Sequence, residues 1–204
     1  AIMEKFLVGI TIEDHGSASE MVLKATHPKR ILGVTTSEVR FTVYASPDQI
    51  WRFRAQTSNG AIRIDADFDG LLDLRTSNGS IILRSGTGGV TLRTSNGSID
   101  LGSIRFTESS SVRTSNGRIE GTVSFPQSGT FTFENSNGPV DLRMPDDTLG
   151  TFDVSTSNGM VDFRLGHDVV TKQRKAFVTR GSCPCVRIKT SNGNVTVQEW
   201  GYGF

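Results

Sequence analysis

Apolar and polar residues alternate in short runs along most of this chain. Such alternation predicts half-buried β-strands, because successive side chains of a strand point to opposite faces of the sheet. Between residues 50 and 200 the runs come in pairs, and each pair flanks the same short turn. We therefore expect each repeat to contain two strands that meet at a corner. The apolar positions on the two flanks are Ala55, Leu74, Leu92, Val112, Phe133, Val154 and Ile188 before the turn, and Ile62, Ile81, Ile99, Ile119, Val140, Val161 and Val195 after it.

The turn has the sequence Thr-Ser-Asn-Gly and occurs seven times, once with Asn135 in the place of Thr. A period of about twenty residues is typical of architectures built from stacked repeats. Asn-Gly favours a tight reversal because both residues tolerate positive φ, so we expect positive φ at the corner glycines. The Thr shares the phase of the apolar residues and is expected to point inward, with the Ser outward. The asparagines of the turns are Asn59, Asn78, Asn96, Asn116, Asn137, Asn158 and Asn192.

Two all-β architectures fit this pattern. In a β-solenoid, or β-roll, of about seven coils, equivalent residues of successive repeats stack about 4.8 Å apart. In an antiparallel β meander, the two flanks of each Asn-Gly pair as a hairpin, which would place Arg54 opposite Asp65 and Arg93 opposite Asp100. We favour the solenoid, because only stacking explains why the same four residues recur at each corner.

The repeat also carries a resemblance to a known family. Thr-Ser-Asn-Gly followed by a polar and a β-branched residue, as in Ser80-Ile81 and Ser98-Ile99, resembles the repeat of an adhesin-like family of unknown function with bacterial and fungal members. The resemblance covers roughly residues 50–200. It implies a β-helix-like fold and a surface-adhesion role, and it carries over no catalytic residues. The chain departs from the family pattern in the long interval before the last turn, in Asn135, and in its first fifty residues.

The repeats divide the chain into two parts of what we expect to be one structural domain. Residues 1–50 lack the turn and are interpreted as an N-terminal cap or degenerate coils, or else as the end of a preceding domain. Residues 51–204 form the repeat region, with an insertion at 166–182. We interpret the insertion as a solvated excursion with a strand that lies across the solenoid. Its basic residues, Lys172, Arg174 and Lys175, could instead touch an anionic partner.

The overall charge and the termini narrow the choice of partner and location. The net charge of +1 gives no field that would attract nucleic acid or a membrane surface. No apolar run is long enough for a transmembrane helix, so we expect no membrane insertion. The chain opens at Ala1 and could be a mature form or part of a longer protein. Glycosylation-type triplets at Asn78, Asn96 and Asn194 favour an extracellular or cell-surface location.

We predict no catalytic residue, cofactor or metal site. The histidines are scattered, and no nucleophile motif or phosphate loop occurs. Cys183 and Cys185 are too few for a closed zinc site and are expected to be free thiols or a labile disulfide. Paired acids such as Asp67 and Asp69 match no calcium motif. One row of outward acids, expected on neighbouring coils, would suit the alternative function of a polysaccharide lyase or hydrolase with a surface groove: Asp100, Glu120, Asp141 and Asp162.

The residue just before the turn points outward, and in three consecutive repeats it is arginine: Arg75, Arg93 and Arg113. Stacked at one strand spacing, three like charges repel one another, and only Arg75 has an acid two residues away, at Asp73. Guanidinium forks suit carboxylate and sulfate groups. We therefore predict a non-enzymatic, adhesion-type binding module that holds an acidic polysaccharide, or a surface protein, on this face. The same charged positions argue against ice binding, which needs a flat array of small side chains.

Overall fold

The computed structural model describes residues 10–13, 21–25 and 52–200 of the chain. These residues form strands and connecting turns, without a helix, and the prediction of an all-β protein is confirmed. β1 (Ile10–Glu13) pairs antiparallel with β2 (Met21–Ala25), and β2 pairs parallel with β3 (Arg52–Gln56). The rest of the predicted N-terminal cap and residues 201–204 lie outside the described residues.

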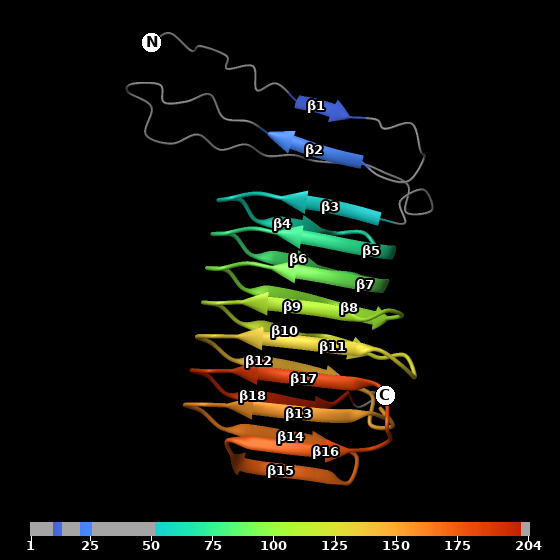
Figure 1. Ribbon diagram of the computed structural model, residues 1–204, viewed down its shortest axis with the longest axis vertical. Helices are drawn as coiled ribbons and strands as arrows, with labels where there is room; N and C mark the ends of the chain where they lie inside the picture. Colours follow the sequence, from blue (N-terminus) through green and yellow to red (C-terminus); the bar gives the residue numbers. More distant parts are fainter. Residues whose placement is uncertain (1–9, 14–20, 26–51, 201–204) are drawn as a thin grey trace.

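The strands of the repeats form two stacks, and each repeat contributes one strand to each stack (Figure 1). Neighbours within a stack run parallel. Because the two flanks of a corner enter different stacks, the meander interpretation is wrong: Arg54 lies in register with Asp73 of the next repeat, not with Asp65. In stacking order, the first stack is β3, β5 (Phe68–Arg75), β7 (Ser85–Arg93), β9 (Ser110–Thr114), β11 (Thr130–Asn135), β17 (Cys185–Thr190) and β13 (Thr151–Thr156). The second is β4 (Ile62–Ile64), β6 (Ile81–Leu83), β8 (Ile99–Phe106), β10 (Ile119–Ser124), β12 (Val140–Met144), β18 (Val195–Glu199) and β14 (Val161–Leu165).

The stacking order differs from the chain order at one place. The last repeat, β17 and β18, lies between the two repeats that precede it in the chain, as the red strands between yellow and orange ones show in Figure 1. The expectation that repeats adjacent in the chain are adjacent in the stack therefore fails for this pair.

The insertion at 166–182 explains this order. After β14, Gly166 has a φ of 56°, and Gly166-His167 turns the chain straight back into β15 (Asp168–Gln173), which pairs antiparallel with β14. A two-residue loop with positive φ matches the twist of a hairpin. β16 (Lys175–Thr179) then pairs antiparallel with β13. The insertion thus adds one strand to the end of each stack instead of crossing the repeats, and the chain returns from there to β17.

The core is a thin layer between the two stacks. The predicted inward positions are buried in every repeat except the first, where Ala55 is partly exposed. Three phenylalanines widen the core beside the loops opposite the corners, which we call the returns. The ring centroids are 5.3 Å apart for Phe106 and Phe131 and 4.8 Å apart for Phe125 and Phe131. Alternation along the sequence therefore assigned the two faces of each strand correctly.

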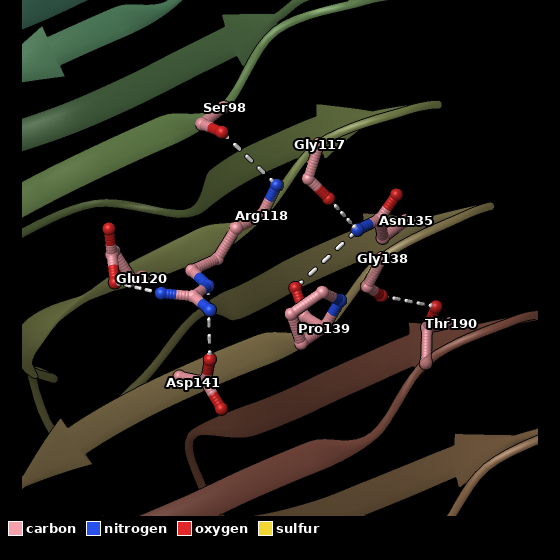
Figure 2. Close-up of polar contacts among 9 residues, drawn as sticks. All are labelled: Ser98, Gly117, Arg118, Glu120, Asn135, Gly138, Pro139, Asp141 and Thr190. Carbon is pink, nitrogen blue, oxygen red and sulfur yellow. Dashed lines mark hydrogen bonds and ion pairs between the residues drawn. The ribbon is translucent and has the colours of Figure 1, made fainter.

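The corners are joined from repeat to repeat by two rows of side-chain hydrogen bonds. The buried Thr94 hydroxyl donates to the carbonyl of Gly79 at 2.8 Å, and the Asn96 amide donates to Oδ1 of Asn78 at 2.7 Å. Asn135 stands in the place of the threonine at its corner, and its side-chain amide donates to the Gly117 carbonyl at 2.6 Å (Figure 2). Both rows continue through the last repeat, β17 and β18, which we call the inserted repeat because of its place in the stacks: Asn192 donates to Asn137, and Asn158 donates to Asn192.

The corner glycines are required for a reason other than the one expected. Of the seven, only Gly138 has a positive φ, at 159°, so the prediction of positive φ is wrong for the other six. A Cβ on Gly97 would instead lie 2.0 Å from the carbonyl oxygen of Gly79 in the next repeat. The corners stack so closely that no side chain fits between them.

Candidate functional site

The three predicted arginines lie side by side on the outer face of the first stack. Arg75 is in register with Arg93, and Arg93 with Arg113. Their side chains are exposed because the preceding residues, Leu74, Leu92 and Val112, fill the core. Neighbouring members are one strand spacing apart, about 4.8 Å.

The stacking order extends this row with residues that are distant in the chain. Arg113 is followed by Glu134, then by Lys189 of the inserted repeat, then by Ser155, and Ser155 is in register with Lys175 of β16. We call the row from Arg75 to Lys175 the basic column. The sequence placed Lys175 in a separate basic excursion; it gave Lys189 the same outward position before the turn as the arginines, but not its place directly beside Glu134. Their places in the row depend on the stacking order.

Ion pairs neutralise part of the basic column. Arg75 donates from Nε to Asp73 at 2.9 Å, and Asp73 also accepts from Arg54 at 3.1 Å. Arg113 pairs with Glu134 at 3.1 Å. Arg93 and Lys189 have no ion pair or side-chain hydrogen bond with the described part of the chain. Two of the column's positive charges are therefore exposed and uncompensated, on either side of the Arg113–Glu134 pair.

A shallow groove of about 310 Å³ follows the basic column along the corner edge. Arg93, Arg113 and Lys189 line it, together with Glu134. The opposite side is formed by the serines of four successive corners. Because these residues repeat from strand to strand, the groove runs perpendicular to the strands. The serines are Ser95, Ser115, Ser136 and Ser191.

The basic turn of the insertion lies at the same edge of the molecule. Arg174 accepts a hydrogen bond at its carbonyl from the N–H of the corner residue Thr156, at 2.9 Å. Lys172, with a φ of 59°, and Lys175 flank it. The two groups of basic residues predicted separately thus meet at the end of the basic column.

The predicted acid row lies on the second stack and is only partly continuous. Asp100, Glu120 and Asp141 are in register on neighbouring strands, as predicted. Thr196 of the inserted repeat follows Asp141, so the prediction is wrong for Asp162, which lies beyond it.

Each acid of this row is held by a neighbour. Arg118 reaches between Glu120, at 3.4 Å, and Asp141, at 3.6 Å (Figure 2). Asp100 accepts from the N–H of Gly102 at 2.9 Å. Asp162 hydrogen-bonds Arg164 at 2.7 Å and raises the pKa of that guanidinium. Three of the four acids are thus in ion pairs and Asp100 accepts from the backbone, so the row forms no pair of free carboxylates across a groove.

The described residues contain no cluster of three or more histidine, cysteine or acidic side chains that could hold a metal ion. Cys183 and Cys185 are free and exposed. Within the same ranges no helix is long and apolar enough to cross a membrane.

Comparison of the chain with protein-family models, with curated proteins and with solved structures finds no match in any of the three. The resemblance to the adhesin-like repeat family stays a prediction from the sequence.

Proposed function

We propose that this chain is a β-solenoid binding module whose basic column holds an extended acidic glycan. The observation that carries the proposal is the position of Arg93, an unpaired guanidinium in a groove that also contains Arg113 and Lys189. Guanidinium groups bind carboxylates and sulfates with two parallel hydrogen bonds, and Lys adds a point charge. The serine hydroxyls on the other side of the groove supply donors and acceptors for sugar hydroxyls.

The shape of the site favours a polymer over a small anion. Charges and hydroxyls repeat along the stack, and the step from Arg93 to Lys189 covers three strand spacings, about 14 Å. Among the described residues, the groove lining includes no aromatic side chain on which a nucleic-acid base could stack, and the net charge is only +1. These features support a glycan bearing carboxylate or sulfate groups. The resemblance to the adhesin-like family supports a location at the cell surface.

The alternative function, glycan cleavage, has less support. The acid row that suggested it lies on the other stack, and its members are hydrogen-bonded or ion-paired. A general acid and a nucleophile need two carboxyl groups facing each other across the sugar.

Binding to polygalacturonate and to heparin, measured against ionic strength, tests the proposal. We expect affinity to fall steeply with added salt, since exposed charges are screened within about 10 Å at 0.1 M salt. Arg93→Ala should weaken binding about fivefold, because exposed charge pairs contribute up to about 1 kcal/mol. Arg143→Ala is the matched control: Arg143 is also exposed and unpaired among the described residues, but it lies on β12 of the other stack.

Two results would overturn the proposal. One is unchanged binding when Arg75, Arg93 and Arg113 are all replaced by Ala. The other is equal weakening by Arg93→Ala and Arg143→Ala, which would show that only net charge matters.

A further inference from the structure

A second, larger groove lies on the side of the returns, opposite the corners. Its volume is about 510 Å³, within the range of about 300–1,000 Å³ found for ligand sites. Asp67 and Asp69 line one end, and Pro145 and Trp200 line the other. The basic column contributes no residue to it. The two grooves are therefore separate candidate sites.

The floor of this groove is polar because buried and outward-pointing residues alternate along the strand ends that form it. Ile104 and Val123 are buried, so the residues on either side of each point outward. Strand pairing places these outward residues in two rows that run along the stack. The rows are Ser85, Ser103 and Thr122, and Thr87, Arg105 and Ser124.

Gly86 keeps the floor open beside Phe68. A Cβ on Gly86 would lie 2.2 Å from the Phe68 ring, so only glycine lets that ring occupy its place in the groove wall. From Phe68 to Val123 the floor spans three strand spacings, about 14 Å, and Pro145 and Trp200 extend it further. This length accommodates several units of an extended chain.

We propose that this groove binds a neutral oligosaccharide along the stack. Trp200, with 44% of its surface exposed, brings an aromatic ring to the groove lining, and such a ring can pack against the C–H face of a sugar. The hydroxyl rows, the two carboxylates and Arg105 offer donors and acceptors to sugar hydroxyls at regular intervals. Two acids against one base make the groove net negative, so it does not favour the anionic polymer proposed for the basic column. This inference does not depend on that proposal.

Titration with cellohexaose and mannohexaose, each also followed by calorimetry, tests the groove. The chain has two tryptophans, so a Trp51→Phe variant leaves Trp200 as the sole tryptophan, whose fluorescence can be excited selectively. We expect a saturable change in its fluorescence with at least one of these neutral hexasaccharides. An excess of polygalacturonate should not compete.

Two variants of the full chain locate the binding. Trp200→Ala removes the ring, and Ser103→Tyr fills the floor from an exposed position, so that neither change empties the core. Each should lower affinity about tenfold or more, with an unchanged melting temperature. Arg164→Ala, on the outer face of β14, is the matched control and should bind like the parent.

The proposal is overturned if neither hexasaccharide gives saturable binding at millimolar concentration. It is equally overturned if binding survives in both Trp200→Ala and Ser103→Tyr, or if polygalacturonate displaces the sugar. New reducing ends in the cellohexaose or mannohexaose samples would show that the protein cleaves the sugar, and would overturn the proposal of a site that only binds it.

Discussion

Replacement of a corner glycine provides the most direct test of how the repeats are joined. In a Gly97→Ala variant, the new Cβ would lie 2.0 Å from the Gly79 oxygen, 2.4 Å from the Gly79 carbonyl carbon and 2.8 Å from the Ser80 nitrogen. All three are backbone atoms, so no side chain can rotate away. The two corners must separate, and this disturbs the hydrogen bond from Thr94 to Gly79.

The expected cost follows from these contacts. Overpacking a dense site costs about 1–3 kcal/mol, and loss of a hydrogen bond adds about 1 kcal/mol. Alanine also restricts the unfolded chain more than glycine does, and this stabilises the folded state by about 0.4–1 kcal/mol. Gly97→Ala should therefore destabilise the protein by about 1–4 kcal/mol.

Gly60 provides a matched control within the same chain. It belongs to an identical Thr-Ser-Asn-Gly corner, but among the described residues a Cβ there would meet its own Thr57 alone, with the nearest atom at 3.3 Å. Gly60→Ala should change stability by less than about 1 kcal/mol. Urea unfolding followed by circular dichroism measures both variants. Equal losses in the two variants would refute the argument, because a requirement of the turn itself, rather than of stacking, would act on both.

Three further predictions concern the core, the corner and the basic column. Ile99→Ala should cost about 2–5 kcal/mol in the same unfolding assay, since Ile99 is fully buried, and a loss below about 1 kcal/mol would contradict the packing described. Thr114→Val keeps the shape of a buried side chain but removes the hydroxyl that donates to the Gly97 carbonyl at 2.8 Å. It should lower the free energy of unfolding by about 1–2 kcal/mol, and an unchanged urea midpoint would show that the hydrogen bond contributes nothing. Glu134→Gln frees Arg113 and removes the acid from the groove, so affinity for heparin should rise at low salt, whereas a fall would mean that Glu134 itself contacts the ligand.

The local pattern of the sequence determined the repeat unit. Alternation along each flank assigned Leu92 and Ile99 to the core and Arg93 to the surface, because a strand has only two faces and the core accepts only one of them. Recurrence of the same corner indicated that equivalent residues stack, and this placed Arg75, Arg93 and Arg113 in one row.

The tertiary structure decided which repeats are neighbours. All seven corners carry nearly the same residues, so each can form the same hydrogen bonds with any other, and the local pattern does not distinguish among stacking orders. After the reversal at Gly166, β15 pairs with β14 and β16 pairs with β13. These two strands occupy the free end of each stack, so the final repeat pairs between β11 and β13 instead. For this reason alone Lys189 lies between Glu134 and Ser155, and Asp162 leaves the acid row. The need for glycine at a corner such as Gly97 likewise arises between repeats, because a carbonyl oxygen lies 2.0 Å from where a side chain would begin. At Gly60, where the described residues provide no such neighbour, the nearest atom is 3.3 Å away.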